Sequence, residues 1–169
     1  MAYQTAYLKA NFTAEYMAAL LTSVKDDKDK LAGYLHECRR MGIRVLPPDV
    51  NASEADFAPI GADIRFGLTA VRNVGAAAMG ALVAERRAKG PFKSLSDFAL
   101  RLDPKSGNRR QIENLALAGA FDLLESDRSR VHAGVEMILQ HANSAASERD
   151  SGQVSLFGSG TEEIGSAHV

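Results

Sequence analysis

The sequence predicts a mainly α-helical protein with a short extended segment in its first half. Apolar residues recur at three- and four-residue spacing through most of residues 13–142, which is the period of amphipathic helices. Two consecutive prolines interrupt this pattern, and Ile64, Phe66 and Leu68 then alternate as in a short strand. After residue 142 the composition shifts to Ser, Ala, Gly and charged residues, which predicts a disordered tail or linker.

Two helices are expected in the first third. Thr13 can cap the first, whose apolar stripe consists of Met17, Leu20, Leu21 and Val24. The charged run KDDKDK then breaks the pattern, and the stripe is repeated by Leu31, Tyr34, Leu35 and Cys38. Gly42 is suited to end this second helix, because glycine adopts the left-handed conformation at low cost. The extended segment follows, and we place a domain boundary near residue 66.

Short helices joined by tight turns are expected after this boundary. Residues 68–72 form a brief helix, 73–75 a sharp turn, and 76–89 a longer helix closed by Gly90 and Pro91. The next helical face comprises Leu95, Phe98, Ala99 and Leu102. Asn108 and Gln111 form a capping-box start for the following helix. A turn at 119–124 leads to a last helix, whose inward residues are Val131, Val135, Ile138 and Ala142.

Composition and charge limit the class of protein. The net charge of −1 hides a middle region of +3, since residues 61–140 hold 12 basic and 9 acidic side chains. That excess weakly favours an anionic partner. No run approaches the roughly 18 to 20 apolar residues that span a bilayer, and no signal peptide is evident, so a cytoplasmic protein without membrane contact is expected. A single cysteine, Cys38, excludes an internal disulfide, and no metal site is predicted.

Two joints, at residues 71–76 and 117–121, share the same order of a helix, a short turn with apolar residues and a glycine, and a second helix. A glycine in such a joint lets the backbone turn sharply and can present main-chain N–H groups to a phosphate, as in helix-hairpin-helix DNA binding. Asn73 stands where such hairpins often have a first glycine, and Asn tolerates positive φ. The candidate DNA-binding residues are Arg72, Asn73, Val74, Gly75, Ala76, Arg109, Arg110, Gly119, Ala120, Arg128 and Arg130. The alternative is that both glycines only end and turn helices in a bundle.

Four segments carry a resemblance to a known family: AYLKANFTAEYMAALLTS, HECRRMGIRVLPPDVN, IRFGLTAVRNVG and NRRQIENLALAGAFDLL. In this order and spacing, over residues 3 to about 125, the chain resembles the C-family bacterial replicative DNA polymerases, the alpha subunits of DNA polymerase III. The resemblance implies that residues 1–66 are the last part of the polymerase fingers. It implies a tandem helix-hairpin-helix domain at 67–142 that holds duplex DNA, and a flexible tail at 143–169.

The tail contains QVSLF, which resembles the internal sliding-clamp-binding peptide of this family. The matching residues are Gln153, Val154, Ser155, Leu156 and Phe157. An extended peptide of this kind can press its Leu and Phe into an apolar pocket while Gln forms a hydrogen bond at the rim. The resemblance therefore implies duplex DNA, a sliding clamp and the rest of the polymerase and replisome as partners.

No catalytic residue is assigned. Polymerisation by two metal ions needs clustered carboxylates, and in this family those aspartates lie upstream of the region matched here. The parent polymerase is expected to use Mg²⁺, while this chain is expected to hold no cofactor and to be inactive alone. A second hypothesis is a stand-alone helical adaptor that recruits a protein through its tail peptide without binding DNA.

Overall fold

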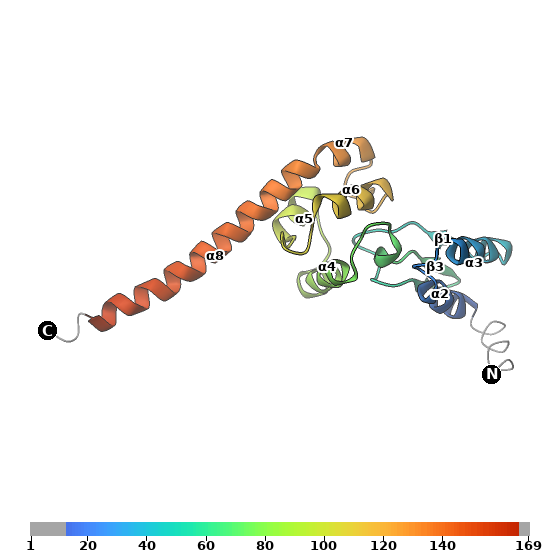
Figure 1. The fold of residues 1–169 in the computed structure, drawn as a ribbon, viewed down its shortest axis with the longest axis horizontal. Helices are drawn as coiled ribbons and strands as arrows, with labels where there is room; N and C mark the ends of the chain where they lie inside the picture. The colour runs from blue at the N-terminus through green and yellow to red at the C-terminus, as the bar shows by residue number, and fades with distance from the viewer. Residues whose placement is uncertain (1–12, 166–169) are drawn as a thin grey trace.

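The computed structural model describes the backbone of residues 13–165 and the side chains of residues 13–152. Within this range the protein is mainly helical with one small sheet, which confirms the predicted fold class. Figure 1 shows an elongated molecule in which helices α2 (Thr13–Ser23) and α3 (Lys28–Arg40) lie at one end, and a long helix, α8 (Val135–Gly165), projects from the other. Helices α4 (Ala76–Lys89), α5 (Leu95–Arg101), α6 (Arg109–Leu117) and α7 (Arg128–Ala133) lie between.

The first two helices pack on a three-stranded sheet. The strands are β1 (Val45–Leu46), β2 (Ala58–Ile60) and β3 (Asp63–Arg65), in the order β1-β3-β2. β3 is central, parallel to β1 and antiparallel to β2. The core between helices and sheet includes Met17, Leu21, Cys38, Phe57 and Ile64. The sequence predicted a strand at Ile64, whereas β2 was missed because Pro59 interrupts its short apolar pattern.

The end of α3 follows the predicted signal, whereas its start is fixed by a cap that the sequence analysis did not name. The Asp27 carboxylate accepts a hydrogen bond from the Lys30 amide and so caps the start of the helix. Gly42 has φ +77°, and the Ile43 amide donates to the Cys38 carbonyl, which closes the helix with the expected left-handed glycine. The charged run KDDKDK therefore separates α2 from α3 and also supplies the cap of α3 through Asp27.

A second core joins α4 to α8. Three aromatic rings form its centre, where Phe98 meets Phe92 and Phe121 edge to face, with ring centroids 5.1 and 5.0 Å apart. Around them lie buried aliphatic side chains from each helix: Met79, Leu82, Ile112, Leu115, Val131, Val135 and Ile138. The four residues predicted to point inward from the last helix are all buried, although Gly134 divides that helix into α7 and α8.

Residues 49–54 connect the part of the protein that contains the first core to the part that contains the second core. The Val50 side chain lies in the second core, and its amide donates to the Ala120 carbonyl. The buried Arg86 guanidinium donates to the carbonyls of Val50 and Ser53, at 2.9 and 2.7 Å. Asn51 exchanges two hydrogen bonds with the backbone of Phe92. This loop precedes the boundary placed at residue 66, yet it packs with the part that follows.

Helix α8 continues beyond the predicted start of the tail. It was expected to end near residue 142, but its backbone is helical to Gly165. Residues 143–151 contain no glycine or proline, so nothing local stops the helix there. The side chains of residues 147–152 are all exposed, and Figure 1 shows this part of α8 leaving the body of the protein. No helix in the described region is long and apolar enough to cross a membrane.

Candidate nucleic-acid interface

The first joint forms a sharp corner between a 3-10 turn, η1 (Leu68–Ala70), and helix α4. Asn73 has φ +61°, as expected for the residue that replaces a glycine in this turn. Gly75 has φ −82° and ψ 143°, an ordinary extended conformation, and it is the N-cap of α4. Asn73 is therefore the residue with the left-handed conformation. The backbone conformation of Gly75 does not require a glycine at that position.

The first turn of α4 presents unused hydrogen-bond donors. Gly75 has no side chain to cap the helix, and no acidic residue occupies the first turn. The first amide of this helix with a backbone acceptor is that of Met79, which donates to the Gly75 carbonyl. Among the described residues, the amides of Ala76, Ala77 and Ala78 have no acceptor, and Ala76 and Ala77 are exposed. Such free amides at the positive end of a helix dipole favour an anion.

The second joint has a different geometry. Gly119 has φ +87° and is buried. Its amide donates to the Ala116 carbonyl, and the Ala120 amide donates to the Leu115 carbonyl, at 3.1 and 2.9 Å. These two bonds close the end of α6 in the pattern typical of a left-handed glycine cap. The amides of Gly119 and Ala120 thus have acceptors within the protein, as the helix-ending alternative expects, and their contact with phosphate stays a prediction.

Most of the candidate cations at the second joint are paired. Arg128 binds Asp122 at 2.7 Å and also donates to the Leu117 carbonyl, so its guanidinium covers Gly119. Arg109 pairs with Glu113 at 2.7 Å and Glu136 at 3.3 Å, and Arg130 lies 3.8 Å from Glu125. The hydrogen bond from Arg109 lowers the pKa of the Glu113 carboxyl, and the one to Asp122 raises the pKa of Arg128. These three guanidinium groups therefore already have carboxylate partners within the protein.

Two of the predicted basic residues have no such partner. Arg72 lies beside the first corner and Arg110 lies in the first turn of α6, and both are exposed. Neither is within ion-pair distance of a carboxylate in the described region. Their charges are therefore available to an external anion.

Helices α4 and α6 meet where each begins. A Cβ placed on Gly75 would lie 3.3 Å from Nε2 of Gln111, so the first turn of α6 contacts the corner. The backbone N–H of Gln111 donates to the Asn108 side chain, as predicted, but the backbone N–H of Asn108 does not donate back to the Gln111 side chain. Sequence reasoning treated Gln111 only as a cap. Its place against Gly75 depends on how α4 and α6 pack, so no local signal could have indicated it.

The other predicted residues are placed as follows. Val74 is half-buried against the second core, behind the exposed corner. The backbone of Gln153, Val154, Ser155, Leu156 and Phe157 belongs to α8, whereas their side chains lie outside the described residues.

Among residues 13–152 no three His, Cys, Asp or Glu side chains gather as a metal site would require. The side chains of these residues therefore do not fit the Mg²⁺ that the resemblance implies for the parent polymerase.

The fold and the corner define the class to which the protein belongs. A family model described as helix-hairpin-helix motif matches residues 42–131, more than half of the chain, and the chain belongs to this family. Over nearly its whole length it is similar to DNA polymerase III subunit alpha, which confirms the predicted resemblance. It is 54% identical over 94% of its length to that protein of Mycobacterium leprae, 48% over 93% to that of Thermus aquaticus, and 40% over 96% to that of Haemophilus influenzae.

The chain spans only 13–14% of the length of these relatives. The similarity therefore concerns one segment of a much longer protein.

Proposed function

We propose that this chain is the part of a bacterial replicative DNA polymerase that holds duplex DNA by its backbone and docks the sliding clamp. The observation that supports the DNA-binding half is the start of α4, where the amides of the exposed residues Ala76 and Ala77 lack acceptors, together with the unpaired Arg72 before this corner and the unpaired Arg110 on α6. Amides and arginines directed at phosphate contact every sequence alike. The binding is therefore independent of sequence.

The two joints have unequal roles in this proposal. The corner at Gly75 contacts phosphate through its amides, and Arg110 extends the contact from the neighbouring helix. The corner at Gly119 positions α6 and α7, because its amides are used within the protein and Arg128 covers it. Arg109, Arg128 and Arg130 reach DNA only after exchanging carboxylate partners, so we assign them a smaller share of the affinity.

Salt dependence tests the DNA-binding half. Neutralising Z phosphates gives a slope of about −0.9Z in a plot of log affinity against log salt concentration. We expect titration of the whole chain with a 20-base-pair duplex at several salt concentrations to give a slope steeper than about −2, with equal affinities for unrelated sequences. An affinity that hardly responds to salt would favour the helical adaptor instead.

The clamp-docking half rests on residues 153–157 and on the form of α8. An extended peptide must leave the helix, and Gly152, Gly158 and Gly160 each disfavour a helix by about 1 kcal/mol relative to Ala. Since residues 147–152 are all exposed, little buried surface opposes unwinding from this point. The segment can therefore change conformation at low cost.

Tethering through DNA explains how a peptide of low affinity is sufficient for docking to the clamp. Burying Leu156 and Phe157 contributes about 3 to 6 kcal/mol before ordering costs, less than the approximately 8 kcal/mol of a micromolar complex. If the same chain holds DNA that passes through the clamp, the peptide binds at a raised local concentration. The peptide alone binds weakly, and the two contacts reinforce each other.

Replacing both Leu156 and Phe157 with Ala is expected to abolish clamp binding and to leave duplex affinity within two-fold. The reason is that only the two apolar side chains that enter the clamp pocket are lost. Surface plasmon resonance with immobilised clamp, with and without primed duplex, measures both. Substitution of Ser147 and Ser151 with Ala, on the exposed part of α8 before the peptide, serves as the control. Clamp binding that survives the loss of Leu156 and Phe157 would show that the peptide assignment is wrong, without affecting the DNA-binding half.

A further inference from the structure

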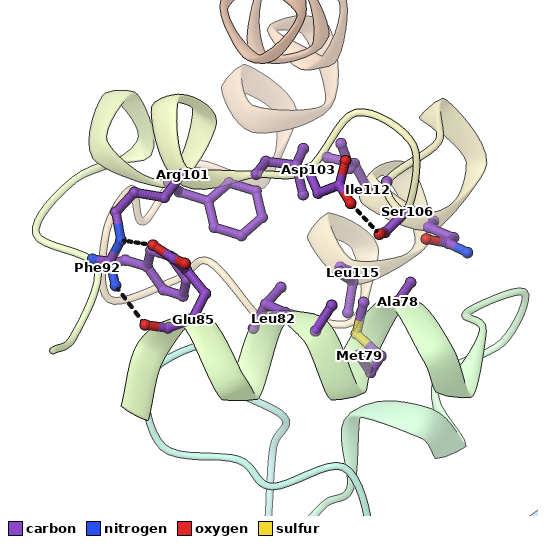
Figure 2. Close-up of a pocket in the computed structure, with 15 residues that line it drawn as sticks. Ala78, Met79, Leu82, Glu85, Phe92, Arg101, Asp103, Ser106, Ile112 and Leu115 are labelled. Carbon is purple, nitrogen blue, oxygen red and sulfur yellow. Dashed lines mark hydrogen bonds and ion pairs between the residues drawn. The ribbon is translucent and has the colours of Figure 1, made fainter. Parts of the chain in front are cut away.

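A cavity of about 200 Å³ lies in the second core, and its lining includes Ala78 and Gln111, which lie near the corner at Gly75. Figure 2 shows it between α4 on one side and α5, α6 and the loop 103–107 on the other. Its walls are apolar and include the buried side chains of Met79, Leu82, Phe98, Ile112 and Leu115. Close packing is the rule in protein interiors, so a void of this size is a specific feature of this core.

The charged side chains that line the cavity have partners, whereas one buried side-chain acceptor has none. Arg101 pairs with Glu85 at 3.2 Å, and Ser106 donates to Asp103 at 2.9 Å, as the dashed lines in Figure 2 show. Oε1 of Gln111, which also lines the cavity, is buried and accepts no hydrogen bond. An unsatisfied buried acceptor is costly, so a donor at this position would be favoured.

Size and chemistry together specify the occupant. An apolar cavity of about 150 Å³ holds benzene, so one of about 200 Å³ has room for a ring with a substituent or a small fused ring. A water molecule could satisfy Gln111 but would leave the apolar walls without contacts. We propose that the cavity binds a small aromatic molecule with one hydrogen-bond donor, of the phenol or indole class, whose donor meets Oε1 of Gln111.

Methyl NMR of the whole chain detects such binding directly. Met79 lines the cavity, whereas Met17 lies in the separate first core, so one methionine reports and the other serves as an internal control. Ring currents from bound phenol or indole are expected to shift the Met79 methyl signal in a saturable way and to leave that of Met17 in place. An unmoved Met79 signal up to millimolar phenol and indole would overturn the proposal.

Two variants identify the site and the hydrogen bond. Ala78→Leu adds three carbons to the cavity wall, and saturable shifts are expected to disappear. Gln111→Met removes the acceptor while keeping a similar volume. The ratio of phenol to toluene affinity is expected to fall about five-fold in this variant, the loss of one hydrogen bond, and comparing the ratio between proteins cancels the different hydrophobicity of the two probes.

Each variant can also contradict the proposal. Shifts that persist unchanged in a folded Ala78→Leu protein would place the ligand outside the cavity. An unchanged affinity ratio in Gln111→Met would remove the hydrogen bond, and with it the class of ligand. If Ala78→Leu does not fold, Leu82→Phe fills the same space and provides the same comparison.

Discussion

Replacing Phe98 with Ala is expected to lower the free energy of unfolding by about 3 to 5 kcal/mol. Phe98 is 1% exposed and its ring contacts both Phe92 and Phe121, so its removal breaks two edge-to-face pairs. The neighbouring cavity makes the loss larger, because Phe98 lines it and the void would extend. Urea denaturation followed by circular dichroism measures this change as a lower midpoint at a constant slope.

Leu100 provides the matched control on the same helix. It is 54% exposed, so Leu100→Ala is expected to change the free energy of unfolding by less than about 1 kcal/mol. Equal losses for the two variants would mean that the three aromatic rings do not form the centre of the second core. Because Phe121 closely follows the Gly119 corner, the loss of Phe98 should also loosen the second joint.

Replacing Arg72 and Arg110 with Glu is expected to weaken duplex binding about 100-fold at 0.1 M salt and to make the salt slope shallower by about 2. Each of these cations is exposed and unpaired in the described region, so each can neutralise one phosphate without breaking an internal contact. Fluorescence anisotropy with a labelled duplex, repeated at several salt concentrations, measures both changes.

The control must change the net charge equally. Lys30 and Arg39 are exposed on α3, in the other part of the molecule, and their replacement with Glu also changes the charge by −4. We expect this variant to weaken duplex binding less than ten-fold, through the general field alone. If both double variants lose the same affinity, net charge controls binding and the corner at Gly75 is not the contact site.

The two glycine joints show how far local sequence reasoning extends. Both have the same pattern of helix, glycine and helix, and both turn the chain where expected. In the first, Asn73 supplies the left-handed step and the amides at the start of α4 stay free. In the second, the glycine itself is left-handed and its amide closes α6. A pattern of residue types predicts a turn, but it does not state which donors the turn uses.

The sequence by itself determined most of the helices, the cap at Asn108, the left-handed residues at Gly42 and Asn73, and the membership of the family. These features depend on residues within about one helical turn, whose propensities and hydrogen bonds are local. Only the tertiary structure decided which arginines are free, where Gln111 lies, and that residues 49–54 bind the second core. Many of those outcomes depend on partners far apart in the chain, such as Glu136 for Arg109 and Phe92 for Asn51, which meet only when the helices pack.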